Sequence, residues 1–142
     1  MQPALRLRSC EPLPKALGVV LVGSAVDAAE TARITRQFET RGDRVTRLSE
    51  AGPGHPLPDG TDLVVVLGGD GSILRAARWM GYQQVPALGI NRGRLGFLAD
   101  TPRPQATEAI ADLVAGRFRL VDHMMFECEI VREGRSLRRD LG

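Results

Sequence analysis

The feature that most constrains the fold is an aliphatic run that leads directly into a glycine-rich turn. Leu63–Leu67 reads Leu-Val-Val-Val-Leu, and residues 68–72 read Gly-Gly-Asp-Gly-Ser. A short, uninterrupted run of valine and leucine is typical of a strand buried on both faces, as in a parallel sheet. A helix is expected to follow from Ile73 to about Met80. Strand, glycine turn and helix in this order predict an α/β fold.

Three further segments are expected to be strands of the same sheet. Residues 16–22 and 85–90 are aliphatic runs of strand length, and residues 44–48 carry a weaker signal of the same kind. Residues 51–60 are rich in proline and glycine and are expected to form a loop. Alternating strands and helices imply right-handed crossovers, so we expect an open, mostly parallel sheet with flanking helices.

Two more helices are indicated by their start and stop signals. Asp27 opens a segment that resembles a helix start, and Gly42 is placed to end that helix. Thr101 with Pro102 is expected to start a later helix, which ends before Gly116. Both helices would lie between strands, as crossovers of a parallel sheet do.

The pattern changes near the C-terminal end of the chain. Phe126, Cys128 and Ile130 alternate with glutamates, which predicts an antiparallel strand with one buried face. A turn at Glu133-Gly134 would lead into a returning strand from residue 136. Because two strands alone are marginal in water, this segment either packs on the parallel sheet or begins another domain. We favour the second interpretation.

The domain prediction follows from this change of pattern. Residues 1–15 are expected to be an N-terminal extension, residues 16–118 an α/β nucleotide-binding domain, and residues 119–142 the start of a truncated, β-rich domain. With 142 residues, the chain has room for only one complete domain.

Composition excludes several kinds of chemistry. Lys15 is the only lysine among 19 basic residues, so a P-loop lysine or a lysine Schiff base deeper in the chain is excluded. The net charge of +2 is too small to suggest nucleic-acid binding. Aromatic residues make up 4%, so the core must be aliphatic.

Cysteine and histidine are equally sparse. Cys10, Cys128, His55 and His123 are too scattered for a disulfide framework or a zinc site. No segment approaches the roughly 20 apolar residues of a membrane helix. We therefore expect a cytoplasmic protein with free thiols and no membrane partner.

The turn at residues 68–72 is the first candidate site. Glycine amides at a helix start attract phosphate oxygens, although a plain tight turn is the alternative. Asp70 is anionic at neutral pH and would repel phosphate. It is therefore expected to hold a magnesium ion or to take a proton from an attacking hydroxyl; otherwise its side chain caps Ser72 or Ile73 in an Asx-turn. Arg75 and Arg78 share a helix face, where Arg75 can reach a phosphate or both can be solvated.

The second candidate site is the glycine-rich stretch 89–96. Asn91 can read ribose hydroxyls or a base edge, or it can be an ordinary turn asparagine. Phe97 can form a stacking surface for adenine, or it can be a core aromatic.

Together the two loops resemble the NAD kinase family. The residues that carry the resemblance are Gly68-Gly69-Asp70-Gly71-Ser72 and then Gly89-Ile90-Asn91-x-Gly93-x-Leu95-Gly96-Phe97-Leu98. Diacylglycerol and sphingosine kinases carry a motif similar to the first, and the second motif is more specific. The resemblance runs from about Ala16 to the end of the chain. It implies a Rossmann-like sheet of the diacylglycerol and NAD kinase type, followed by the first strands of an all-β domain.

The resemblance also implies an activity. Asp70 would accept the proton of the 2′-hydroxyl on the adenosine ribose of NAD, and ATP with magnesium, or polyphosphate, would donate the phosphoryl group. Gly71 and Arg75 would contact the nucleotide, and Asn91 and Phe97 would lie along the NAD cleft. NAD and ATP binding would also involve Gly68, Gly69 and Ser72, which replaces the family's usual threonine but keeps the hydroxyl.

Three functions remain open from sequence. The first is an NAD kinase that is a dimer or tetramer when intact, with this chain an incomplete and inactive part of it. The family's Asn-Glu or Asn-Asp pair would fall just beyond Gly142. The second is a lipid kinase of the diacylglycerol type, and the third is a nucleotide-binding module without catalysis.

Overall fold

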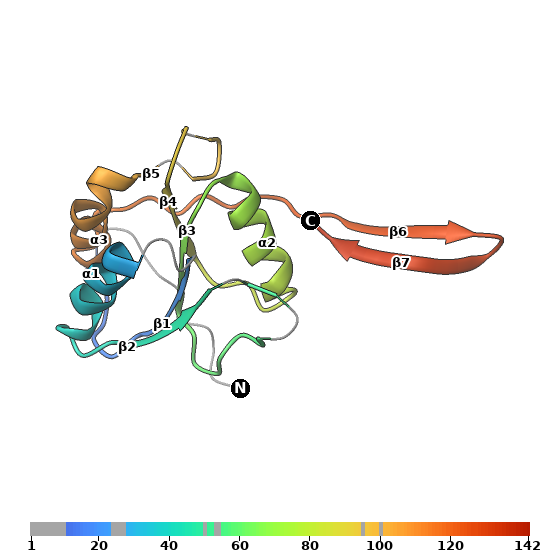
Figure 1. The fold of residues 1–142 in the computed structure, drawn as a ribbon. Helices are drawn as coiled ribbons and strands as arrows, with labels where there is room; N and C mark the ends of the chain where they lie inside the picture. The colour runs from blue at the N-terminus through green and yellow to red at the C-terminus, as the bar shows by residue number, and fades with distance from the viewer. Residues whose placement is uncertain (1–10, 24–27, 50, 53–54, 95, 100) are drawn as a thin grey trace.

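A five-stranded parallel sheet forms the centre of the computed structural model, with helices on both of its faces and a separate two-stranded hairpin beside it (Figure 1). The structure describes residues 11–23, 28–49, 51–52, 55–94, 96–99 and 101–142. The elements in chain order are β1 (Gly18–Val22), α1 (Ala28–Glu39), β2 (Arg44–Leu48), β3 (Leu63–Leu67), α2 (Asp70–Met80), β4 (Ala87–Asn91), β5 (Thr101–Pro102), the 3₁₀ turn η2 (Arg103–Gln105), α3 (Ala106–Val114), β6 (Glu127–Arg132) and β7 (Arg135–Leu141).

The strand order of the parallel sheet is β2-β1-β3-β4-β5. The chain therefore first builds outward from β1 to β2 and then crosses to the other side of β1 to add β3, β4 and β5. Open α/β sheets bind ligands outside the carboxyl ends of the strands, near the position where the strand order reverses. In this sheet that position lies between β1 and β3.

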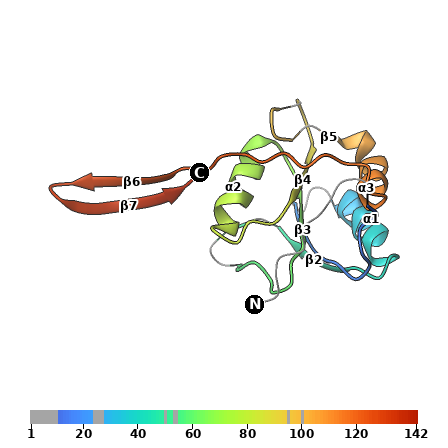
Figure 2. The same ribbon diagram turned by 180° about the vertical axis from the view of Figure 1, so that it is seen from behind.

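Two of the three inner strands, β1 and β3, are buried on both faces, as the aliphatic runs predict. Every residue of β1 and β3 is buried. Alternate side chains of these strands belong to two separate clusters, one with Ile34 and Phe38 of α1 and the other with Ala76 and Met80 of α2. Figure 2 shows the same division from behind, with α1 and α3 on one face of the sheet and α2 on the other. Phe38 is the one aromatic side chain among the buried core residues that the structure describes, so the core is aliphatic as expected.

Helix boundaries differ from the sequence expectations at two places. α2 begins at Asp70 rather than Ile73, because the backbone of the glycine turn is already helical from its third residue. Thr101 and Pro102 do not start a helix; they pair with the end of β4 as β5, and helical structure begins at Arg103. Asp27 lies outside the described residues.

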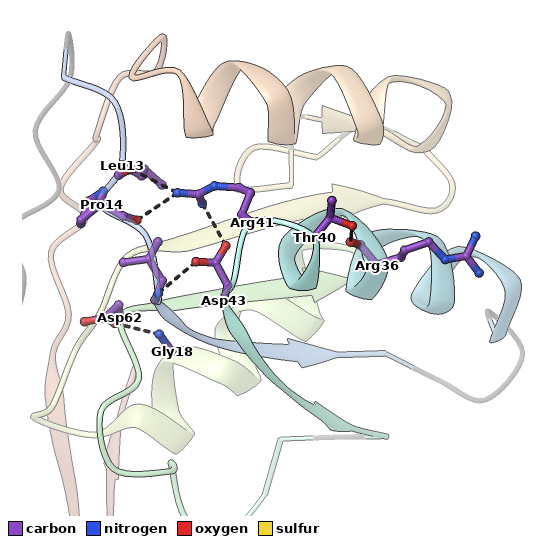
Figure 3. A network of polar contacts seen from close by, with 9 residues as sticks. Leu13, Pro14, Gly18, Arg36, Thr40, Arg41, Asp43 and Asp62 are labelled. Carbon is purple, nitrogen blue, oxygen red and sulfur yellow. Dashed lines mark hydrogen bonds and ion pairs between the residues drawn. The ribbon is translucent and has the colours of Figure 1, made fainter.

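The amino end of β1 is held by two aspartates, which Figure 3 shows in detail. The buried Asp43 accepts a hydrogen bond from the N–H of Leu17 at 2.9 Å and forms an ion pair with Arg41, also at 2.9 Å. Asp62 accepts the N–H of Gly18 at 2.9 Å. Because these aspartates precede β2 and β3, they fix the start of β1 between its two neighbours.

The segment before β1 is attached to the same domain. Leu13 is buried in the cluster with α1 and α3, and its N–H donates to the carbonyl of Val114 at 2.9 Å. Arg41 donates to the carbonyl oxygens of Leu13 and Pro14 at 3.1 and 2.9 Å. The last residues of the expected N-terminal extension therefore pack on the α/β domain, while residues 1–10, including Cys10, lie outside the described part.

The hairpin β6–β7 is antiparallel, as expected, but its expected buried face is absent. Every residue of β6 is exposed, including Ile130 at 56%. The turn is the expected one, with positive φ at Glu133 and Gly134. In Figure 1 the hairpin projects away from the sheet beyond α2. The alternation of apolar and charged residues predicts which side chains share a face of the strand. Whether that face is buried depends on another element that packs against it.

Among the described residues, no helix has the length and apolar character needed to cross a bilayer.

Candidate functional site

The two glycine-rich loops meet at the carboxyl ends of β3 and β4. The N–H of Gly68 donates to the carbonyl of Ile90 at 3.0 Å, which joins the first residue after β3 to the adjacent strand. The next residue, Gly69, is the N-cap of α2, and Asp70 occupies the first helical position. The parallel sheet therefore brings the two sequence motifs to one edge.

Asp70 is the residue around which the two loops are organised. Its Oδ2 accepts the backbone N–H of Phe97 at 2.9 Å, and its Oδ1 accepts those of Leu98 and Ala99, both at 3.0 Å. The N–H groups of Ser72 and Ile73 donate instead to the carbonyl of Gly69. The side chain of Asp70 thus reaches across to the second loop, and the alternative of a local Asx-turn is wrong.

These hydrogen bonds also set the charge of the carboxyl. The N–H groups of Ala99, Phe97 and Leu98 stabilise the carboxylate and lower the pKa of Asp70 below its ordinary value, against a smaller opposing effect of burial. Asp70 is therefore a carboxylate at neutral pH and is free to accept a hydrogen bond from a hydroxyl.

Asn91, at the end of β4, holds the second loop in shape. Its Nδ2 donates to the carbonyl oxygens of Arg94 and Ala99 at 2.6 and 3.0 Å, and its Oδ1 accepts the N–H of Gly93 at 2.8 Å. The side chain is buried, and both of its N–H groups are used within the loop. This is the turn-asparagine alternative. Because Ala99 bonds to both Asn91 and Asp70, the two residues are connected through it.

Two glycines are required by close approach within the site. A Cβ on Gly68 would lie 2.3 Å from the Oγ of Ser72. A Cβ on Gly96 would lie 2.2 Å from the Oδ1 of Asp70. Gly96 belongs to the sequence motif, but its contact with Asp70 was not foreseen.

The remaining candidate residues lie on the open side of the site. A Cβ on Gly69 or Gly71 would meet nothing within 4 Å. Arg75 is exposed on α2, one turn after the start of the helix. Phe97 is 98% exposed, so it is not a core aromatic, and its ring is available for stacking. Ser72 is half-buried beside Gly68.

Sequence reasoning singled out Asp70 but missed the groups that donate hydrogen bonds to its side chain. The groups that bind Asp70 are backbone amides of residues 97–99, and every residue except proline carries such a group. The sequence signal nearest to them was Gly96, a glycine directly before the rare aromatic Phe97. No group of three or more His, Cys, Asp or Glu side chains is placed to hold a metal ion in the part of the chain that the structure describes.

The strand order and the polar loops at the carboxyl ends of β3 and β4 define an open, doubly wound α/β domain of the kind that binds nucleotides. The sequence model of the family described as the ATP-NAD kinase N-terminal domain matches residues 7–118 of this chain. The chain therefore belongs to the NAD kinase family.

The alignments with curated relatives include most or half of this chain but a smaller share of each relative. The NAD kinase of Heliobacterium modesticaldum is 35% identical in an alignment 128 residues long that covers 83% of this chain and 45% of that protein. The NAD kinase of Rhodopirellula baltica is 49% identical over 72 residues, which are 51% of this chain and 23% of that protein. The chain spans less than half the length of these relatives.

Solved structures share the fold. Yeast NADH kinase, crystallised with NADH, superposes with a TM-score of 0.66 at 19% identity, over 89% of this chain and 47% of that one. The NAD kinase of Archaeoglobus fulgidus, in complex with ATP, gives a TM-score of 0.56 at 20% identity, over 79% and 40%.

Proposed function

We propose that this chain is the nucleotide-binding part of an NAD kinase, which transfers the terminal phosphoryl group of ATP to the 2′-hydroxyl of the adenosine ribose of NAD. In this reaction an oxygen–phosphorus bond forms at the ribose, the bond between the β- and γ-phosphates of ATP breaks, and the hydroxyl proton leaves. The products are NADP and ADP. Membership of the NAD kinase family supports the reaction, and the loop geometry supports the roles below.

The observation that carries the proposal is the Asp70 carboxylate, held between two loops at the carboxyl edge of the sheet. It is ionised and fixed by three backbone N–H groups, so it can accept a hydrogen bond from the 2′-hydroxyl in a defined direction. The lowered pKa makes Asp70 a weak base. A weak base suffices, because phosphoryl transfer depends mainly on positioning and on stabilising charge, with little demand for early proton removal.

Other residues of the site take supporting roles in this proposal. The exposed residues Gly69 and Gly71, with the N–H groups of Asp70 and Gly71 at the start of α2, would meet phosphate oxygens, and Arg75 would neutralise their charge. Phe97 would stack on an adenine ring. Asn91 would shape the loop, and its contact with NAD stays a prediction.

ATP would enter as its magnesium complex, as a substrate. Magnesium in such complexes keeps several waters and takes most other ligands from phosphates, so it does not need a preformed cage of carboxylates. Polyphosphate as the donor, and a dimeric or tetrameric assembly, also belong to the proposal.

The test is the substitution Asp70→Asn in the full-length protein, with NADP formation measured at saturating NAD and ATP. Because Asp70 would both orient the 2′-hydroxyl and take its proton, its loss should lower kcat by about 10²- to 10⁴-fold, the usual cost of losing a positioned base, with little change in KM. The matched control is Asp112→Asn on α3, which removes the carboxylate of an exposed ion pair with Arg117. Near-normal turnover of Asp70→Asn would rule out the base role.

Substrate choice is tested separately. Unsubstituted protein is offered NAD and diacylglycerol in parallel with labelled ATP, and label is expected only in NADP. Label in the lipid alone would replace this proposal by the lipid-kinase alternative.

A further inference from the structure

We propose that Gly96 is a positioning residue of this site: the space left by its missing side chain holds the Asp70 carboxylate so that Oδ2, and not Oδ1, receives the substrate hydroxyl. The inference rests on the proposed function for the identity of that hydroxyl. The arrangement of Gly96 and Asp70 can be tested without any substrate.

Gly96 is required by space rather than by backbone conformation. The glycines with positive φ in the described part of the chain are Gly42, Gly60, Gly81, Gly116 and Gly134, and Gly96 is not among them. A Cβ on Gly96 would lie 2.2 Å from Oδ1, 2.4 Å from Oδ2 and 2.4 Å from Cγ of Asp70. All three contacts are far inside van der Waals range, so any side chain at this position must displace the carboxyl group.

The displaced group could not keep its hydrogen bonds. The carboxylate contacts a tight turn, in which the N–H of Gly96 points to the carbonyl of Ala99 at 3.5 Å and the N–H groups of residues 97–99 converge on Asp70. Asn91, at the end of β4, holds this turn by donating a hydrogen bond to the carbonyl of Ala99. With the turn held from the sheet side, the carboxyl group itself has to move.

The hydrogen bonds distinguish the two oxygens of Asp70. Among the residues that the structure describes, Oδ1 accepts from both Leu98 and Ala99, whereas Oδ2 accepts from Phe97 alone. A carboxylate offers about two acceptor positions on each oxygen, so Oδ1 is saturated and Oδ2 keeps one position. The hydroxyl therefore binds at Oδ2, next to the backbone of the exposed Phe97.

Amide resonances provide the substrate-free test. In the unsubstituted protein, the amide protons of Phe97, Leu98 and Ala99 should shift together as pH falls and Asp70 is protonated. Gly96→Ala should abolish this common titration or move its midpoint, whereas Gly93→Ala should preserve it, since a Cβ on Gly93 would meet nothing within 4 Å. An unchanged common titration in Gly96→Ala would overturn the proposal.

A double-mutant cycle covers the case in which Gly96→Ala folds poorly. If the clash is with the Asp70 carboxyl, Gly96→Ala should lower Tm strongly in the presence of Asp70 and only slightly in an Asp70→Ala background. Equal losses in both backgrounds would contradict the proposed contact.

Turnover of the full-length Gly96→Ala protein then tests the link to catalysis. We expect kcat to fall at least tenfold with KM for ATP changed less than threefold, because the carboxylate is misdirected while the phosphate-binding amides remain. A rise in KM with kcat unchanged would overturn the positioning role. If Gly96→Ala loses the common titration of the three amide protons but still forms NADP at the normal rate, the proposed role of Asp70 in catalysis is rejected instead. The two proposals therefore fail separately.

Discussion

Asp43 shows how a single buried side chain can determine where a strand begins. Its carboxylate is fully buried and serves two donors, the N–H of Leu17 and the guanidinium of Arg41. Arg41 in turn binds the carbonyl oxygens of residues 13 and 14. One carboxylate therefore organises the entry of the chain into β1.

Removing this carboxylate should be costly. In Asp43→Ala, the N–H of Leu17 and the charge of Arg41 lose their partner in a buried place, so we expect the free energy of unfolding to fall by about 3 kcal/mol. Asp43→Asn should lose less, because its amide oxygen still accepts the N–H of Leu17. Urea denaturation followed by circular dichroism measures both.

The control is Asp59→Ala, an exposed aspartate in the loop before β3, which should change the free energy of unfolding by no more than about 0.5 kcal/mol. Equal stability of Asp43→Ala and Asp59→Ala would mean that the buried network contributes nothing.

At the same scale, the sequence predicted side chains better than it predicted their partners. Asp70 stands out as a charge inside a glycine turn, and Phe97 as a rare aromatic in a glycine-rich loop. The three N–H groups that bind Asp70 leave no such signature, because they belong to the backbone. Asn91 was expected to contact the nucleotide or to be an ordinary turn asparagine, and the structure shows that its amide bonds within the loop.

Among the elements, strands were predictable to within about two residues because their signal is local. An aliphatic run has few other places to lie than inside a sheet, and Leu63–Leu67 has the predicted bounds. The short strand β5 had no such signal, since Thr101 and Pro102 are extended only because they pair with β4. Tertiary pairing decided that case.

The hairpin β6–β7 touches the α/β domain through a polar contact at its base. Tyr82, in the loop after α2, donates its hydroxyl to Oε2 of Glu127, the first residue of β6. The hydrogen bond to Glu127 raises the pKa of Tyr82 above its ordinary value, with smaller contributions from burial and from the negative charge of Glu127.

This contact gives a prediction that absorbance can test, because Tyr82 is the only tyrosine in the chain. In a spectrophotometric titration, the phenol should ionise above pH 10, and Glu127→Gln should bring the midpoint down towards 10. A phenol with a raised pKa stabilises the contact below pH 10, and this stabilisation is lost as the pH rises through the raised pKa.

Glu133→Gln, which removes the same charge at the hairpin turn, serves as the control and should leave the titration of Tyr82 unchanged. If the midpoint already lies at 10 in the unsubstituted protein, the hairpin does not hold this position in solution.

At the scale of the whole molecule, the parallel sheet and the hairpin are separate structures. β6 and β7 pair only with each other, and the buried core ends at Leu113 among the described residues. The proposed division of the chain into residues 16–118 and 119–142 rests on this separation.

The division predicts the outcome of a truncation. A chain that ends at Met125 lacks the whole hairpin and loses no buried core residue. We expect its Tm to lie within about 2 °C of the parent value, since a surface change of about 0.5 kcal/mol moves Tm by that amount in a domain of this size. Thermal unfolding followed by circular dichroism measures the shift.

A matched truncation that ends at Asp112 removes Leu113 and part of α3, and it should unfold at a much lower temperature. If the shorter loss at Met125 already lowers Tm by more than about 5 °C, the hairpin belongs to the α/β domain and the proposed division is wrong.

The amino ends and the carboxyl ends of the strands hold different groups, which affects how the sequence of such a chain can change over time. Asp43 and Asp62 anchor the amino edge, while Asp70 and the two glycine loops occupy the carboxyl edge. The length of the strands separates the anchors from the chemistry. Substitutions that strengthen the amino ends of the strands can therefore accumulate without altering the candidate site, which makes those ends the natural starting place for directed stabilisation.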